Sequence, residues 1–411
     1  TGDTIWFGAD GGYSFISSLA ESNKLAVKSL AALEQKLQSR DLHPLFLTGH
    51  TGWTDNFEFA FAHKDKLCSP FRKRVPDPTA PYDAYDEFGV IYPPLVVLFY
   101  KAISLLFPAK LAAQEIKASS LGMVIFTIYT VACVMLLIKC IKKYKIGNGL
   151  DKFLFAVSMF LSVPMIFLLE RGNILILVIS LLFVFLYGYD SEKASTRHLA
   201  YICLAIAVSI KLYPVVFGLL LLRKEKNFKN IAWCVFYGII FFFVPFIFIG
   251  GFSQLFVLIK NILYTSSMFG NKGYGFKVNI SNICQAFGEK MKVQSSTTDW
   301  IAGVLMLILL CMVIFVVFIS RQEWEKAYAL CMVLTLIPTF SWIYNEIYLL
   351  IPITLLLYER PELKKNTVLP LILMMLIMGE FPYISLFNSL EGYHKISLST
   401  MLGNASMWVL M

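Results

Sequence analysis

Hydrophobic and polar positions divide the chain into two parts near residue 92. Residues 1–92 are polar and irregular, and 17–42 predicts one amphipathic helix. After residue 92, apolar runs alternate with short polar segments, and several approach the roughly 20 residues that a helix needs to cross a bilayer. The runs are 93–107, 121–138, 153–169, 174–187, 231–249, 301–319, 327–338, 349–358 and 369–378. The pattern predicts an all-α, polytopic integral membrane protein with a helical domain at 93–411.

The composition supports this class. Of all residues, 57% are hydrophobic and 15% are charged, whereas soluble domains are about half apolar and a quarter charged. The net charge is +9, from 36 Lys and Arg against 27 Asp and Glu. The basic residues form short clusters between apolar runs, as in cytoplasmic loops. Because no basic tract is interleaved with aromatic residues, we exclude nucleic-acid binding.

Six of the eight cysteines lie in or beside apolar segments and are expected to behave as small hydrophobic residues. Cys68 and Cys284 fall in the two long polar regions, and they can pair if both regions face an oxidising side. No spacing of Cys and His predicts a metal site.

The segment 198–222 has two candidate topologies. Its 25 residues are enough for one crossing, but basic residues flank it on both sides. A single crossing places the two basic flanks on opposite sides of the membrane. A re-entrant hairpin bent at 211–214 keeps every basic cluster on one side, and each arm, about 18 Å long, is too short for a 30 Å core. We favour the hairpin, with Pro214 fixing the bend.

With this hairpin, the interior loops are short and basic, and the exterior segments are long and rich in aromatic residues. The longest exterior segment is a loop at 250–298. The side of residues 1–92 stays open at this point. They are cytoplasmic if 93–107 crosses the bilayer, and external if 93–107 is another short re-entrant arm.

Two basic residues sit at or within apolar runs, where a charge costs about 2.5–3.5 kcal/mol at a helix centre. Arg171 either faces the headgroups from an ordinary turn or binds a phosphate with its guanidinium. Lys211 has two readings as well. It snorkels or pairs with a buried carboxylate, or it presents an ammonium to a lipid phosphate at the apex of the hairpin.

Other polar residues have an ordinary and a functional interpretation. Tyr92 precedes two prolines that open an apolar helix, which is common at a first helical turn. Residues 341–346 join two helices at the predicted outer side. Trp342 suits a membrane interface, whereas the carboxylate of Glu346 is unexpected at membrane depth. The polar carboxylates of 1–92 include Asp55, Glu58, Asp83, Asp86 and Glu87, and most surface carboxylates only face solvent.

Taken in order, these elements resemble the motifs of GT-C glycosyltransferases. Asp55 begins an Asp-Asn-Phe-Glu-Phe sequence similar to the Asp-x-x-x-aromatic motif of their first external loop. The Pro-Tyr at 81–82 and the Tyr-Pro-Pro-Leu at 92–95 resemble elements of bacterial polyprenyl-phosphate-mannose-dependent mannosyltransferases of the phosphatidylinositol mannoside type. Segments 171–173 and 210–214 are similar to motifs of the first mannosyltransferase of GPI-anchor synthesis. The series covers most of 50–360.

The resemblance implies that residues 1–92 are external, with a catalytic loop at 51–92, and that a membrane helix precedes Thr1. It also implies an activity. A hexose, with mannose favoured, moves from polyprenyl or dolichyl phosphate to a lipid or glycan acceptor at the non-cytoplasmic face, with inversion at the anomeric carbon.

In this interpretation Asp55 is the general base, with Asp83 and Glu87 as alternatives because the gap from Asp55 to Tyr92 is long. The leaving phosphate departs as an anion and needs positive charge beside it. The donor-phosphate candidates are Arg171, Lys211, Tyr213 and Tyr92. The sugar or acceptor candidates are Asn173, Asn345, Glu346 and Trp342. No metal or other cofactor is expected.

Other classes also fit. Broken helices and midplane charges occur in transporters and flippases of lipid-linked or small anionic substrates, although the two halves show no internal repeat. An assembly subunit of a glycan-synthesis complex and a headgroup or aminosugar transferase are further alternatives. The expected location is the inner membrane in a bacterium or the endoplasmic reticulum in a eukaryote.

Overall fold

The computed structural model describes the chain from residue 92 onward, with gaps. The described residues are 92–104, 106, 120–147, 149–223, 228–249, 251–256, 258–259, 262–263, 280–338, 341, 343–359, 365–378, 385–388, 395–397, 405–406 and 408–410. The candidate bases Asp55, Asp83 and Glu87 lie outside them, and so does Trp342. The chain divides into two compact units. Unit one is Thr1–Leu136, Phe167–Leu177 and Phe243–Asn261, and unit two is Leu137–Ile166, Val178–Phe242 and Ile262–Met411.

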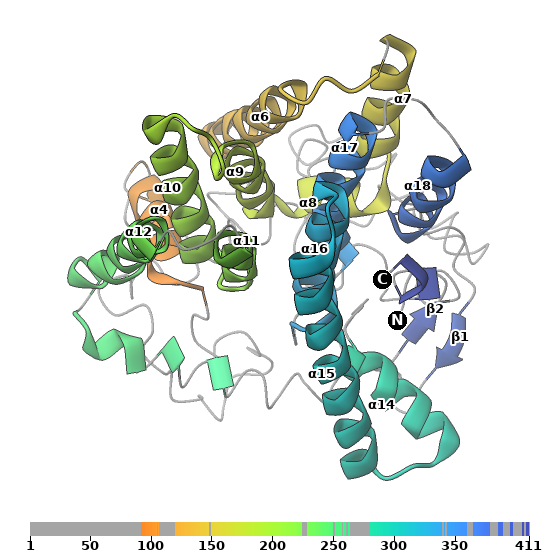
Figure 1. Cartoon of the computed structure of the whole chain (residues 1–411). Coiled ribbons are helices and arrows are strands. Elements are labelled where there is room, and N and C mark those ends of the chain that lie inside the picture. Colours follow the sequence, from red (N-terminus) through yellow and green to blue (C-terminus); the bar gives the residue numbers. More distant parts are fainter. Residues whose placement is uncertain are drawn as a thin grey trace, which may run out of the picture. The chain divides into compact units, whose positions relative to one another are not determined.

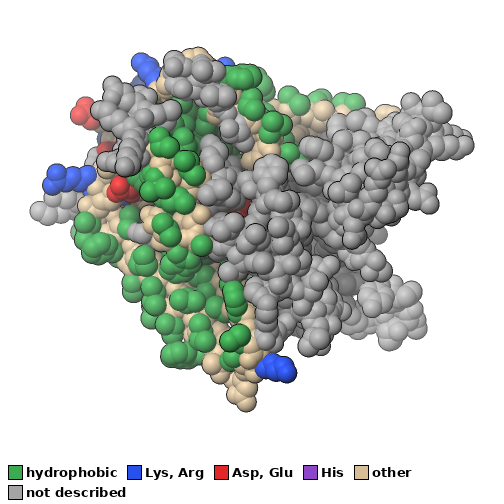
Figure 2. Space-filling model, turned by 90° about the vertical axis from the view of Figure 1, so that its right-hand side faces the viewer, with side chains coloured by type: hydrophobic (Ala, Val, Ile, Leu, Met, Phe, Trp, Pro, Cys, Tyr) green, Lys and Arg blue, Asp and Glu red, His purple; other side chains and the backbone are tan. Residues whose placement is uncertain are grey.

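Three helices are long and apolar enough to cross a membrane: α6 (Ser120–Lys142), α12 (Phe228–Ile247) and α15 (Ser295–Ile319) (Figure 1). Large apolar side chains on them are exposed, among them Ile128 at 63%, Ile239 at 52% and Leu307 at 63%. Apolar surface of this extent suits lipid rather than water. Figure 2 shows hydrophobic side chains gathered over much of the described surface on one face. The protein is an all-α polytopic membrane protein, as predicted.

Shorter elements make up the rest of the described chain. They are α4 (Pro94–Ser104), α7 (Gly149–Phe160), α8 (Val163–Arg171), α9 (Leu175–Gly188), α10 (Ala194–Ile210), η2 (Tyr213–Gly218), α11 (Leu219–Arg223), α14 (Ile280–Met291), α16 (Glu323–Leu336), η3 (Ile343–Leu349), α17 (Leu350–Glu359), α18 (Lys365–Met378), and an antiparallel pair of strands, β1 (Ser385–Asn388) and β2 (Lys395–Ser397). Helix α4 has 11 residues, about 16 Å, which favours a short arm over a full crossing.

Two predicted segments differ in detail. The run 153–169 is not one helix, because it breaks between α7 and α8. At the break, the Ser162 hydroxyl donates to the carbonyl of Met159 at 2.7 Å, and Pro164 has no N–H for the helical ladder. The predicted loop 250–298 contains α14 and the start of α15, which lie against each other (Figure 1). Cys284 in α14 is a free cysteine.

In unit one, Arg171-Gly172-Asn173 forms the turn between α8 and α9. Gly172 adopts a positive φ of 60°, and the N–H of Asn173 donates to the carbonyl of Leu168 at 3.1 Å. The Asn173 side-chain oxygen then accepts the N–H of Leu175 at 2.9 Å. Gly172 therefore ends one helix and Asn173 caps the next, because each residue suits that position.

The core of unit two is α16. Twelve of its fourteen residues are buried, and the helix packs against α15 and α17. A helix that is apolar nearly all round is expected to be enclosed by neighbours. Helix α16 therefore provides a fixed element against which the shorter helices of unit two are positioned.

Candidate functional site

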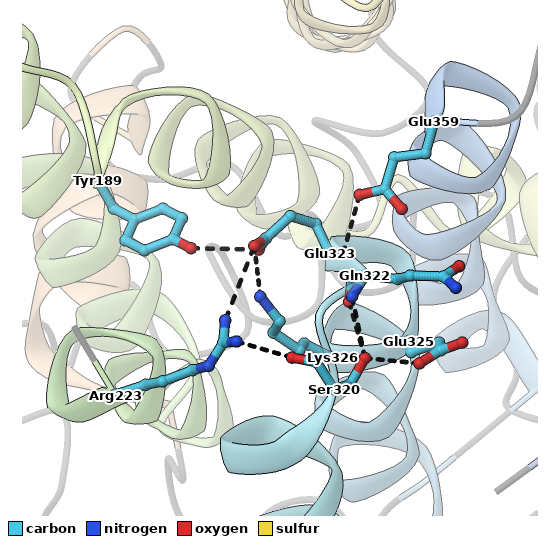
Figure 3. A network of polar contacts seen from close by, with 8 residues as sticks. All are labelled: Tyr189, Arg223, Ser320, Gln322, Glu323, Glu325, Lys326 and Glu359. Atoms are coloured by element: carbon cyan, nitrogen blue, oxygen red, sulfur yellow. Dashed lines mark hydrogen bonds and ion pairs between the residues drawn. The ribbon is translucent and has the colours of Figure 1, made fainter.

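A cluster of charged and hydroxyl side chains gathers around Glu323, the first residue of α16 (Figure 3). The Tyr189 hydroxyl donates to Glu323 Oε2 at 3.1 Å. The Nη1 of Arg223 lies 4.0 Å from Glu323 Oε1, and its Nη2 donates to the carbonyl of Ser320 at 2.8 Å. Tyr189 precedes α10 and Arg223 ends α11. The two ends of the segment 189–223 therefore both lie beside Glu323.

Two further residues complete this group. The side chain of Lys326 is 0% exposed and donates to Glu323 Oε1. The backbone N–H of Glu323 donates to Glu359 Oε1, at the end of α17, at 2.8 Å, and burial raises the pKa of the Glu359 carboxyl above its ordinary value. We call Tyr189, Arg223, Ser320, Glu323, Lys326 and Glu359 the Glu323 cluster.

Tyr144 extends the same end of unit two to the basic tract that follows α6. Its ring centroid lies 6.2 Å from that of Tyr187 and 5.6 Å from that of Tyr358. Helices α9, α11, α16 and α17, together with the tract after α6, therefore have one end in common. These are the segments whose basic flanks predict one side of the membrane. Their common end agrees with that topology, and the side of the membrane stays a prediction.

Lys326 directly precedes the predicted apolar run 327–338, but it is not a loop charge. It belongs to the buried helix α16 and is paired with Glu323. A buried ammonium needs a carboxylate partner, and the glutamate three residues earlier on the same helix supplies it.

The hairpin bend lies where the sequence predicts it. Helix α10 ends at Ile210, and Lys211 has extended backbone angles, with φ −138° and ψ 129°. The 3-10 helix η2 then starts at Tyr213, with Pro214 in its first turn. Helix α10 has 17 residues, so Lys211 lies about 25 Å along its axis from the end nearest the Glu323 cluster.

At this far end, Lys211 meets the segment after α16. Its Nζ lies 5.3 Å from the ring centroid of Tyr344, within the range of a cation–π contact. Tyr344, Asn345 and Glu346 are 6%, 4% and 2% exposed, and the Asn345 amide donates to Ser341 Oγ at 3.2 Å. We call Lys211, Ser341, Tyr344, Asn345 and Glu346 the Lys211 apex. The structure thus brings Lys211 to the segment that holds two of the predicted sugar-binding residues.

The remaining candidates are placed as follows. Tyr213 is 43% exposed at the start of η2. Tyr92 is half-buried just before α4, and Arg171 is the last residue of α8. Tyr92, Arg171 and Asn173 belong to unit one, whereas Lys211 and Tyr213 belong to unit two. Their predicted roles in binding stay predictions.

Sequence reasoning missed Tyr344 and the Glu323 cluster. The signal for Tyr344 was present, because an aromatic residue beside a predicted polar site is a natural partner for a half-buried cation such as Lys211. For Glu323 the signal was its place three residues before Lys326 on one helix face. Within the described part of the chain, no group of three or more His, Cys, Asp and Glu side chains could hold a metal ion.

Long apolar helices, a broken hairpin and buried polar residues at its apex define a membrane protein with an internal polar site. The family model for glycosyltransferase family 87 matches residues 91–341, which is more than half of the 411 residues. The chain belongs to glycosyltransferase family 87, and it is a membrane glycosyltransferase. The matched stretch includes Lys211 and Glu323 and ends at Ser341, just before η3. No curated protein matches the chain.

Proposed function

We propose that this glycosyltransferase moves a hexose, with mannose as the first candidate, from polyprenyl or dolichyl phosphate to a lipid or glycan acceptor on the non-cytoplasmic side of its membrane. The observation that carries the proposal is the position of Lys211. Its ammonium lies at the apex of a re-entrant hairpin, against a buried aromatic residue, about 25 Å along α10 from the basic end of unit two. A lipid-phosphate donor keeps its prenyl chain in the bilayer and its charged phosphate at the level of the headgroups, and a hairpin apex that reaches that level places a cation beside the phosphate.

The chemistry of transfer fits one cation and one base. The acceptor oxygen attacks the anomeric carbon, the bond from that carbon to the phosphate oxygen breaks, and polyprenyl phosphate leaves as an anion. A carboxylate takes the proton of the acceptor hydroxyl. Because the leaving group is already a stable anion, it needs a positive charge beside it rather than a proton donor. Lys211 supplies that charge, and Asp55 is the proposed base, with Asp83 and Glu87 as alternatives.

The other proposed contacts follow from the same donor. Asn345 and Glu346 are buried hydrogen-bonding groups on the segment that contacts Lys211, and they are proposed to bind sugar hydroxyls. Tyr213, next to Lys211 in unit two, is proposed to line the phosphate site, and Trp342 to contact the sugar or the acceptor. The roles of Tyr92 and Arg171 in phosphate binding stay predictions from the sequence. Asn173 stays a predicted sugar contact, with one lone pair of its side-chain oxygen already accepting the N–H of Leu175.

The direct test offers purified protein in lipid nanodiscs a synthetic polyprenyl-phosphate mannose, other polyprenyl-phosphate hexoses and nucleotide sugars, with lipid and oligosaccharide acceptors. We expect a covalent product only from a lipid-phosphate donor, and at least a hundredfold loss of turnover in Asp55→Asn with donor binding retained. Turnover only from nucleotide sugars contradicts the proposal. So does ATP- or gradient-dependent movement of the lipid without a new glycosidic bond, which indicates transport. Full turnover in Asp55→Asn transfers the base role to Asp83 or Glu87.

A further inference from the structure

Both ends of the hairpin that carries Lys211 contact the same carboxylate, that of Glu323. Tyr189, just before the first arm, donates to Glu323 Oε2 at 3.1 Å. Arg223, at the end of the second arm, lies 4.0 Å from Glu323 Oε1. In Figure 3, the contacts of Tyr189, Arg223 and the buried Lys326 converge on the Glu323 carboxylate. One residue of α16 therefore holds the beginning and the end of a segment of about 35 residues.

The element that supplies this carboxylate is rigid. Helix α16 is buried along almost its whole length, and Lys326, 0% exposed, pairs with the same Glu323 carboxylate. Near the other end of the hairpin, η2 also packs against α16. Because α16 contacts the hairpin at its base and close to its apex, the hairpin's position along α16 determines where the Lys211 ammonium lies.

We propose that Glu323 is a positioning residue: by binding Tyr189 and Arg223 it sets the depth at which the hairpin presents Lys211. The consequence for catalysis rests on the function proposed above, while the geometric claim does not. The helical arm α10 transmits a shift at its base to its tip, since a helix of 17 residues moves as a nearly rigid rod. Loss of the Glu323 contacts should therefore weaken the contact of Lys211 with the donor phosphate and leave the groups that take part in the reaction unchanged.

The chain offers a matched control two residues away. The Glu325 carboxylate accepts the Ser320 hydroxyl at 2.5 Å, on the first turn of the same helix. Among the described residues, the structure shows no hydrogen bond or ion pair from Glu325 to the hairpin. Glu325→Gln removes the charge on the same helix turn and keeps an oxygen that can accept the Ser320 hydroxyl, so the Ser320 carbonyl that accepts Arg223 stays in place.

The experiment compares Arg223→Gln, Tyr189→Phe and Glu325→Gln in nanodiscs. Arg223→Gln and Tyr189→Phe release one arm each and keep the Glu323–Lys326 pair, so the fold of α16 is preserved. Hydrogen exchange is measured by mass spectrometry on peptides covering 211–219, with α16 peptides as reference. The KM for polyprenyl-phosphate mannose and the kcat are measured on the same samples, and Arg223→Lys tests rescue by a conservative change.

We expect Arg223→Gln to speed exchange in 211–219 about tenfold and to raise the donor KM by a similar factor. The variant loses the ion pair with Glu323 and the charge-assisted hydrogen bond to the carbonyl of Ser320. We expect kcat to change less than about threefold, and Arg223→Lys to recover part of the effect. Tyr189→Phe should act in the same direction but less, and Glu325→Gln should match the unchanged protein.

Exchange in 211–219 that stays unchanged in Arg223→Gln, or that rises equally in α16, overturns the positioning role. A KM effect of the same size in Glu325→Gln also overturns it. If the unchanged protein makes no product from any polyprenyl-phosphate sugar, the proposed function fails, and the exchange measurements still decide the role of Glu323.

Discussion

The Glu323 cluster and the Lys211 apex are polar regions at opposite ends of α10, and they hold their cations differently. In the cluster, Arg223 and Lys326 meet a carboxylate, and hydrogen bonds from Tyr189 and the backbone complete the network. At the apex, the Lys211 ammonium lies over the ring of Tyr344. Lys326 has 0% of its side chain exposed, so leaving its ammonium without a carboxylate is costly. Lys211 is half-buried and faces an aromatic ring, a contact worth about 0.5–2 kcal/mol, so a phosphate can reach its ammonium. The Glu323 cluster therefore holds the hairpin in place, and the Lys211 apex is the candidate phosphate site.

The largest expected effect falls on the apex. Lys211→Met removes the cation and keeps the length of the side chain, so it should lower kcat/KM by about a hundredfold to a thousandfold, as for loss of one group that stabilises a leaving anion. Lys211→Arg should retain a measurable part. The melting temperature should change little, because the residue is only half-buried. A parallel fall of activity and melting temperature would show that Lys211 is structural.

The next largest effect falls on the Glu323 cluster, and it concerns stability rather than activity. Glu323→Ala leaves the buried Lys326 ammonium without its acidic partner and should lower the free energy of unfolding by about 3 kcal/mol. Steric-trapping measurements in lipid bicelles give this quantity. Lys326→Met combined with Glu323→Leu should recover much of the loss, because an apolar pair of similar volume replaces the ions. A double variant no more stable than Glu323→Ala would contradict this account.

A smaller effect tests how the apex holds its cation. Tyr344→Phe keeps the ring face and should change donor KM less than about twofold. Tyr344→Leu removes the ring and should change the donor KM by about fivefold, in line with one cation–π contact. Equal KM values for the Phe and Leu variants would remove the cation–π contact from the account.

The smallest effect concerns pH at the cluster. Burial raises the pKa of Glu359, so this carboxyl takes up a proton at a higher pH in the folded chain than in the unfolded chain. Its contribution to stability is therefore present in acid and is lost as the pH rises through the folded-state pKa. Glu359→Gln keeps an oxygen for the N–H of Glu323 and should flatten this part of the stability-against-pH curve, with a change below about 1 kcal/mol at neutral pH. An unchanged curve would exclude Glu359 as the titrating group.

Local features of the fold were predictable from the sequence. The long apolar helices follow from segment length, and the bend after Ile210 follows from Pro214 and from basic flanks on one side. The break at Ser162 was missed, because a run of apolar residues looks continuous when its hydrogen bonds are not considered.

Contacts between distant segments were less predictable. Lys211 and Tyr344 are separated by more than a hundred residues, and their meeting depends on how η2 and η3 both pack on α16. Lys326 stands in a stretch rich in charges before the apolar run 327–338, and such stretches are usually exposed. Only the packing of α16 shows that Lys326 is buried against Glu323. The sequence therefore identified candidate cations, and the tertiary structure shows that Lys326 is buried against Glu323 whereas Lys211 is half-buried beside Tyr344.

The most direct measurement is the binding of a polyprenyl phosphate, without sugar, to the protein in nanodiscs. Native mass spectrometry across lipid concentrations compares the unchanged protein with Lys211→Met and Arg321→Met. Arg321 is an exposed basic residue and serves as the control. We predict saturable binding that weakens at least tenfold in Lys211→Met and stays the same in Arg321→Met. Equal binding by all three proteins would contradict the claim that Lys211 forms the phosphate site.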